Sequence, residues 1–264
     1  MNRIDKKFNK LRKQHKKAFI AFITAGDPSL RITEELVYSF EGNGVDIVEL
    51  GVPFSDPLAD GPTIQASSQR SLKKGTNLSK IMNTVKRIRQ RSEIPIALMT
   101  YYNPIFHYGE SKFLKDAQKC GVDGIIVPDL PPEEAASFIK LAKINRITVS
   151  FFLAPTTTRQ RMKKVIKATT GFIYYVSLTG VTGARKAFSA NNTTNIRSAK
   201  RMTKKPICVG FGISTSAQVK SVAKIADGVI VGSAIVNQIE KNRGKANLVK
   251  NVSQFVWTLA RGIQ

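Results

Sequence analysis

Cysteine and histidine are both scarce in this sequence, with two of each among 264 residues. Cys120 and Cys208 fall in different expected elements, so they provide neither a disulfide framework nor the spacing of a metal site. His15 falls on the expected first helix and His107 beyond the third expected strand, and with only these two histidines a zinc-dependent aldolase site is not available, so both are expected to be surface residues. We expect both cysteines to be reduced packing residues in a cytosol-like compartment.

Long apolar runs are absent as well. No stretch reaches the roughly 18 apolar residues that a membrane-spanning helix needs, and the N-terminal MNRIDKKFNKLRKQHKK lacks the apolar core of a signal peptide. We therefore expect a soluble, unsecreted, cytoplasmic protein. Abundant Lys, Asn and Ile suit an AT-rich coding genome, so the cytosol of a plastid or an endosymbiont is equally compatible with the composition.

Acidic residues are outnumbered, with 18 Asp and Glu against 42 Lys and Arg and a net charge of +24. No acid occurs between Glu134 and Asp227. Such a surface could attract nucleic acid or an anionic membrane. The lysines and arginines fall mostly on expected outer helices, without aromatic interleaving or a nucleic-acid motif, which favours solvated helix faces and neither of these partners. Steering of an anionic substrate would be a side effect.

Strand and helix patterns alternate along the chain, which is 42% apolar. Strands are expected at 18–24, 45–50, 95–99, 124–127, 147–153, 172–176, 206–209 and 228–231. Helices are expected at 31–41, 78–89, 112–120, 131–142, 159–168, 196–202, 217–223 and 246–260, and a short helix that ends at Ser71 is expected after the loop with Asp56 and Asp60. A first helix over 2–16 carries Ile4, Phe8 and Leu11 on one face and would close the barrel floor. The pattern predicts an α/β protein, a single (β/α)₈ TIM-barrel domain over 1–264 with an extra N-terminal helix.

The stretch from Asp46 to Gln65 carries acids where they are costly. Glu49 interrupts an apolar strand pattern, and Asp60 follows eleven residues later on an irregular loop rich in Gly and Pro. A strand-borne Glu and a loop-borne Asp can be aimed at one cleft. A solvated turn with a half-buried acid is the alternative interpretation of the same spacing.

Glycine turns follow the last two expected strands, at 210–214 and 232–233. In TIM barrels the loops at these positions commonly bind phosphate, because glycine lets backbone amides approach an anion and the next helix adds its dipole. Turn chemistry alone could also explain a single such turn. The Gly, Thr and Ser-rich stretch Ser177–Thr194 has no periodicity and predicts a mobile lid over the site.

Several segments are more specific for a protein family in their exact amino-acid sequence than in the spacing of their residues. They are AFITAGDP at 21–28, DIVELGVPFSDPLADGPTIQ at 46–65, MTYYNPIF at 99–106, SLTGVTGA at 177–184, GFGIS at 210–214 and GSAIV at 232–236. In this order, over nearly the whole chain, they resemble the tryptophan synthase alpha subunit. The resemblance implies a lyase of tryptophan biosynthesis that cleaves indole-3-glycerol phosphate to indole and glyceraldehyde 3-phosphate by a retro-aldol reaction.

Two carboxylates would carry this chemistry. By the resemblance, Glu49 is the general acid/base at the indole carbon and the glycerol hydroxyl, and Asp60 pairs with the indole N–H. The expected strands contain no lysine, which argues against a Schiff base. An indole ring protonated at carbon three can instead serve as the electron sink.

The resemblance also implies a set of binding residues. The indole and glycerol part would meet Phe22, Tyr102 and Tyr174, and the lid residue Thr182 would order the loop against the Asp60 segment on closure. The phosphate would meet Gly183, Phe211, Gly212, Ile213, Gly232 and Ser233. An aromatic core would explain Tyr102 equally well. Leu178 and Pro128 stand where some relatives carry an arginine and a small residue, so a lid contact and the pocket wall differ there.

A partner is implied as well. Pro53, Asp56 and Pro57 match the loop that meets a beta subunit in an alpha2-beta2 tetramer, although Asp56 could be a simple turn acid. Pyridoxal phosphate would belong to that beta subunit, and this chain would hold neither a cofactor nor a metal. A stand-alone indole-glycerol phosphate lyase and a non-catalytic binding barrel are the alternatives, the latter supported by the charge alone.

Overall fold

The computed structural model describes residues 1–176, 190–210 and 212–263, with all their side chains except those of 190 and 191. The strands are β1 Ala18–Thr24, β2 Ile47–Gly51, β3 Ile96–Met99, β4 Gly124–Ile126, β5 Thr148–Ser150, β6 Phe152–Leu153, β7 Ile173–Val176, β8 Ile207–Gly210 and β9 Gly228–Val231. The helices are α1 Arg3–Lys13, α2 Leu30–Gly42, α3 Pro62–Lys73, α4 Leu78–Ile88, α5 Tyr102–Tyr108, α6 Glu110–Cys120, α7 Ala136–Ile144, α8 Arg159–Ala168, α9 Ala190–Met202, α10 Ser216–Ala223, α11 Ser233–Asn242, α12 Leu248–Ala260 and the 3₁₀ turn η1 Arg261–Ile263.

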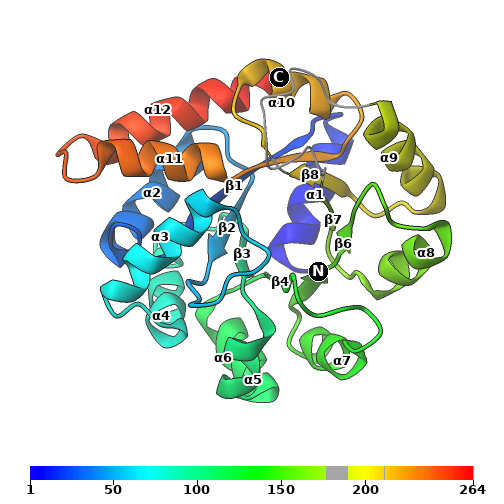
Figure 1. Ribbon diagram of the computed structural model, residues 1–264, viewed down its shortest axis with the longest axis horizontal. Coiled ribbons are helices and arrows are strands. Elements are labelled where there is room, and N and C mark those ends of the chain that lie inside the picture. The colour runs from blue at the N-terminus through cyan, green and yellow to red at the C-terminus, as the bar shows by residue number, and fades with distance from the viewer. Residues whose placement is uncertain (177–189, 211, 264) are drawn as a thin grey trace.

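The strands form a ring surrounded by helices (Figure 1). All strand pairs are parallel, in the order β5-β4-β3-β2-β1-β9-β8-β7-β6. The expected strand at 147–153 is split at Phe151, because β5 pairs with β4 whereas β6 pairs with β7. The two pieces follow each other directly in the chain, so they close the ring. The fold is the predicted TIM barrel, with one of its eight strands divided.

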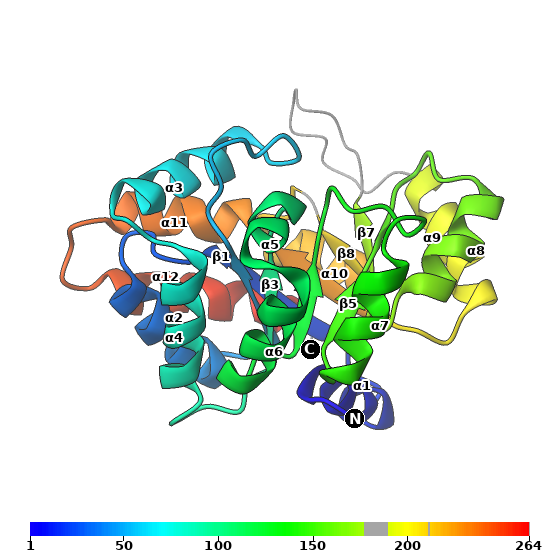
Figure 2. The ribbon, with the colours of Figure 1, turned by 90° about the horizontal axis from the view of Figure 1, so that it is seen from below.

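Strand β1 shows why the core has two parts. All seven of its residues are buried, as expected of a parallel strand covered on both faces. Its alternate residues Phe19, Ala21 and Ile23 pack outward against the helices, whereas Ala18 and Ile20 face the barrel interior. The interior cluster also contains Ile4, Phe8 and Leu11 of α1, which lies beneath the barrel (Figure 2). The predicted role of α1 as the barrel floor is therefore confirmed.

Local sequence signals start the outer helices. Asn77 caps α4 by accepting a hydrogen bond from the amide of Lys80 at 3.0 Å, and α4 then buries Ile81, Val85 and Ile88 on one face. Thr215 and Gln218 form a reciprocal capping box at the start of α10. No helix in the described ranges combines the length and the apolar character needed to cross a membrane.

Four helices differ from the sequence-based expectation: two were not predicted, and two begin at other residues than expected. The short helix α5 and the helix α11 were not predicted, although Ile235, Val236 and Ile239 of α11 are buried at helical spacing. Helix α7 begins at Ala136, because the prolines at 131 and 132 lie in a preceding turn. Helix α9 already begins at Ala190, so the last residues of the expected lid are helical. The first part of the expected lid, 177–189, lies outside the described residues.

Candidate active site

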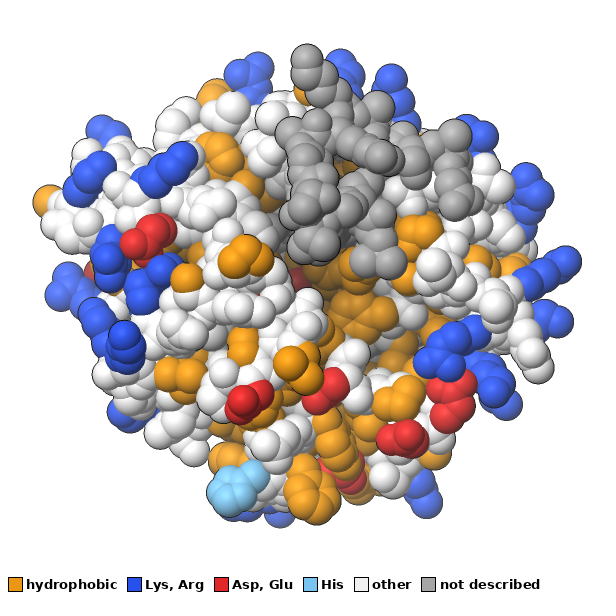
Figure 3. Space-filling model, viewed as in Figure 1, with side chains coloured by type: hydrophobic (Ala, Val, Ile, Leu, Met, Phe, Trp, Pro, Cys, Tyr) orange, Lys and Arg blue, Asp and Glu red, His pale blue; other side chains and the backbone are white. Residues whose placement is uncertain are grey.

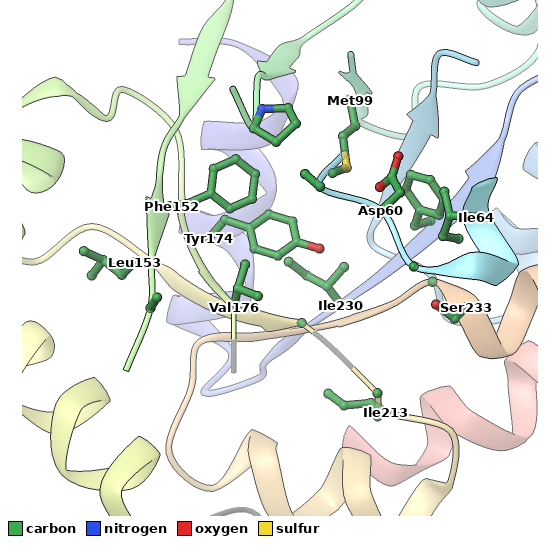
Figure 4. Close-up of a pocket in the computed structure, with 18 of the residues that line it drawn as sticks. Asp60, Ile64, Met99, Phe152, Leu153, Tyr174, Val176, Ile213, Ile230 and Ser233 are labelled. Atoms are coloured by element: carbon green, nitrogen blue, oxygen red, sulfur yellow. The ribbon is translucent and has the colours of Figure 1, made fainter. Parts of the chain in front are cut away.

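A cavity of about 680 Å³ lies at the carboxyl ends of the strands. Figure 3 shows hydrophobic side chains gathered in the hollow on this face. Figure 4 shows Phe152 and Tyr174 on one side of the cavity, with Asp60 and Ile64 across from them. Apolar and aromatic side chains also come from β1, β3, β8 and β9 or the turns after them: Phe22, Met99, Ile213 and Ile230. Such a wall suits a flat apolar group in a substrate that also carries polar groups.

Glu49 lies on β2, in register between Phe22 on β1 and Ala97 on β3. Its side chain is completely buried, and neither carboxyl oxygen has a hydrogen-bond partner among the described residues. Burial raises the pKa of Glu49 to about 8, so the group is mostly protonated at neutral pH. Glu49 is not itself a lining residue of the cavity. Glu49 lies near Tyr174, which lines the cavity. The pKa of the Tyr174 hydroxyl is raised first by burial and then by the charge of Glu49, which places the two side chains close together.

Asp60 lies in the loop between β2 and α3 and lines the cavity. Burial raises its pKa to about 6, and the hydroxyl of Tyr101, which donates to Oδ2 at 3.1 Å, partly offsets this shift. Gln65 of α3 donates to the Asp60 carbonyl at 2.9 Å. Burial therefore favours the protonated form more strongly at Glu49 than at Asp60.

The tyrosine that contacts Asp60 is Tyr101, which the sequence analysis missed. Its hydroxyl bonds Asp60 and accepts from the amide of Ala59 at 2.9 Å. Tyr102, the residue expected in the pocket, points elsewhere: its hydroxyl donates to Glu110 at 2.7 Å, and it is absent from the cavity lining. Tyr101 follows β3 and is the N-cap residue of α5, so no strand or helix periodicity pointed to its contact with Asp60.

Phe22 and Tyr174 lie where they were expected, on the cavity wall. The ring of Phe22 rests on Gly51 of β2, where any Cβ atom would come within 2.5 Å of it, so this position needs glycine. The Tyr174 ring packs against Phe152 with a centroid separation of 4.8 Å. These contacts fix two aromatic faces of the cavity before any ligand binds.

The two glycine turns also reach the cavity, through Gly212, Ile213, Gly232 and Ser233. The helices that follow the two turns differ in whether a side chain bonds the backbone amides at their N-termini. At the start of α10, the Gln218 side chain accepts from the amide of Ser214 at 2.8 Å, whereas α11 has no side-chain cap. The uncapped N-terminus of α11 is thus the more open anion site. The expected residues Thr182, Gly183 and Phe211, and the variant position Leu178, lie outside the described residues.

The loop expected at a partner is largely solvent-facing. Asp56 is exposed and Pro57 partly so, whereas Pro53 is buried. Leu58, which the sequence analysis did not single out, is 94% exposed in the same loop. Pro128, the other variant position, lines the cavity. Among the described residues, no group of three His, Cys, Asp or Glu side chains could hold a metal ion.

Comparison with known proteins identifies the family. The family model described as tryptophan synthase alpha chain matches residues 8–264. The tryptophan synthase alpha chain of Geotalea daltonii is 51% identical over 263 residues, which cover 100% of this chain and 99% of that protein.

Solved structures agree. The structure of tryptophan synthase subunit alpha from Legionella pneumophila has a TM-score of 0.93 and 36% identity, covering 100% of this chain and 98% of that one. A tryptophan synthase structure from M. tuberculosis in its aminoacrylate-bound form has a TM-score of 0.89 at 29% identity, covering 100% of each chain. This chain therefore belongs to the tryptophan synthase alpha chain family of tryptophan-biosynthesis lyases.

Proposed function

We propose that this chain cleaves indole-3-glycerol phosphate into indole and glyceraldehyde 3-phosphate. The observation that carries the proposal is the placement of two carboxyl groups at one cavity, Asp60 on its wall and the fully buried Glu49 beside the lining residue Tyr174. Burial raises the pKa of Glu49 to about 8 and that of Asp60 to about 6, so the protonated state is favoured more at Glu49 than at Asp60. Retro-aldol cleavage of this substrate needs one group that donates a proton and another that stabilises a cation.

The roles of the two groups follow from these states. Glu49 donates its proton to carbon three of the indole ring, which becomes cationic, and Asp60 accepts a hydrogen bond from the ring N–H. The carboxylate of Glu49 then takes the proton of the adjacent glycerol hydroxyl. As that oxygen forms the aldehyde carbonyl, the bond to carbon three breaks and its electron pair restores the neutral indole. Glu49 ends the cycle protonated, as it began.

Binding would use the rest of the cavity. Phe22 and Tyr174 would stack around the indole ring, with Tyr174 near the glycerol hydroxyl. The phosphate would lie at Gly212, Ile213, Gly232 and Ser233, where the uncapped N-terminus of α11 supplies backbone amides. By the family resemblance, Gly183 and Phe211 would complete this site, and Thr182 would order the lid against the Asp60 loop. The location of Tyr102 away from the cavity lining leaves it out of the proposal.

We further propose that the loop with Pro53, Asp56 and Pro57 meets a tryptophan synthase beta subunit in an alpha2-beta2 tetramer in the cytoplasm. The exposed Leu58 beside Asp56 supports a protein contact at this loop, because a large apolar side chain gains stability when a partner covers it. Pyridoxal phosphate would belong to the beta subunit.

The test is indole release from indole-3-glycerol phosphate by the purified chain, alone and with a beta subunit. Slow release that rises strongly with the partner would support an alpha subunit. Fast release without the partner would favour a stand-alone lyase, and no release in either condition would contradict both.

A further inference from the structure

Helix α3, which follows the Asp60 loop directly, buries only polar side chains. They are Ser67, Ser68 and Ser71, and none of the apolar residues along α3, all of which the structure describes, is buried. The neighbouring helix α4, by contrast, buries a row of aliphatic residues such as Ile81 and Val85. Helix α3 is therefore held on the barrel mainly by hydrogen bonds and ion pairs, whose strength depends on geometry.

Three contacts join α3 to the end of β1. The hydroxyls of Ser67 and Thr24 share a hydrogen bond of 2.6 Å, and the Ser71 hydroxyl donates to the Ala25 carbonyl at 2.6 Å. Gly26, with φ of +84°, lies so close beneath α3 that a Cβ atom there would come within 2.4 Å of the Ser71 hydroxyl. The helix thus approaches the backbone of the β1 loop as closely as glycine permits.

Arg70 adds a charged contact between α3 and the loop after β1. Its guanidinium donates to both carboxyl oxygens of Asp27, Nε to Oδ1 at 2.9 Å and Nη2 to Oδ2 at 2.7 Å. The third nitrogen, Nη1, lies 2.8 Å from Oε2 of Glu240 on α11, an ion pair whose geometry is not that of a hydrogen bond. Asp27 is only 2% exposed, so its charge depends on this bidentate partner. One side chain therefore ties α3 to the β1 loop and to α11.

Both ends of this connection lead to the candidate active site. Asp60 lies two residues before the first residue of α3, and Gln65 of α3 holds its carbonyl. Helix α11, which pairs with Arg70 through Glu240, starts at Ser233 on the cavity wall. Without buried apolar packing to compensate, a loss of the Arg70 contacts would let α3 shift and carry Asp60 with it.

We propose that Arg70 is a positioning residue that sets the place of Asp60 relative to the phosphate turn at Gly232 and Ser233. The proposal rests on the proposed cleavage of indole-3-glycerol phosphate. Arg70 does not line the cavity, so it acts through Asp60 and α11 rather than on the substrate. A displacement of about 1 Å in a reacting group can cost about 10²-fold in rate.

The test compares Arg70→Met and Arg70→Lys with Arg89→Met as a matched control. Arg89 likewise pairs with a buried acid, Asp123 at 2.9 Å, but away from the cavity. We expect Arg70→Met to lower kcat for indole release by about 10- to 100-fold. Arg70→Lys, which keeps the charge, should recover part of this loss, and Arg89→Met should keep kcat within about twofold of the unsubstituted chain although it also leaves a buried acid without its partner. An equal fall in kcat for Arg89→Met at a similar loss of Tm would overturn the proposal, since the effect would then be general destabilisation.

A double-substitution cycle with Tyr101→Phe separates positioning from mere stability. Tyr101 bonds the Asp60 carboxyl group directly, whereas Arg70 acts on Asp60 through α3, so the kcat of the double variant should differ from the product of the two single effects by about threefold or more. A simple product would mean that Arg70 does not act through Asp60. If Arg70→Met does not fold, Arg70→Lys and Glu240→Ala enter the same cycle. A lack of indole release by the unsubstituted chain would contradict the proposed function instead.

Discussion

Replacement of Glu49 by glutamine removes the one fully buried carboxyl group that has no hydrogen-bond partner among the described residues. The amide keeps the shape of the side chain but cannot transfer a proton. We therefore expect Glu49→Gln to lose cleavage while it still binds indole-3-glycerol phosphate. The same substitution also has a consequence for stability that is independent of any reaction.

The size and sign of that consequence follow from the pKa. The folded chain holds the Glu49 proton more tightly than the unfolded chain, because burial raises the pKa from 4.5 to about 8. Stability from this group is fully present below about pH 4.5 and is lost as the pH rises through about 8. At about 1.4 kcal/mol per pKa unit, the loss reaches an upper limit of about 5 kcal/mol. Glutamine cannot ionise and avoids this loss.

The assay is urea unfolding of both proteins at about pH 5, 7 and 9. We expect a difference in the free energy of unfolding that is smallest at the lowest pH and grows in favour of Glu49→Gln toward the highest. Glu41→Gln, at an exposed position on α2, serves as the control and should show no such trend. A difference between Glu49→Gln and the parent that stays constant with pH would refute the enclosure of Glu49.

Three further predictions address the site and the core. Gly212→Asp should raise KM for indole-3-glycerol phosphate by roughly tenfold or more, because it places a negative charge beside the substrate phosphate; an unchanged KM would remove this turn from the site. Tyr101→Phe removes a hydrogen bond that lowers the pKa of Asp60, so the acidic limb of kcat/KM against pH should move to higher pH, and an unmoved limb would show that Asp60 does not control it. Ile81→Ala, at a fully buried position of α4, should lower the free energy of unfolding by about 2–5 kcal/mol with little effect on KM; a smaller loss would mean that the core collapses around the gap.

The barrel could be predicted because its signals are local. Continuous apolar runs such as 18–24 indicate strands buried on both faces, and caps such as Asn77 and Thr215 mark helix starts. The split of the fifth expected strand at Phe151 could not be predicted, since it arises from pairing with different neighbours on its two sides. Helix α11 was missed because its first residues also belong to a glycine turn.

At the site, the sequence alone pointed to Glu49 and Asp60 as acids in unusual places and to the glycine turns as an anion site. It could not show which tyrosine of the pair at 101 and 102 contacts Asp60, nor that Glu49 is buried completely enough to raise its pKa. The contacts of Arg70 with Asp27 and Glu240 could not be predicted either. Asp27 lies 43 residues before Arg70 in the chain, and Glu240 lies still further away after it. Periodicity and motif wording are properties of neighbouring residues, whereas the burial and the partners of a polar group depend on segments that only the folded barrel brings together.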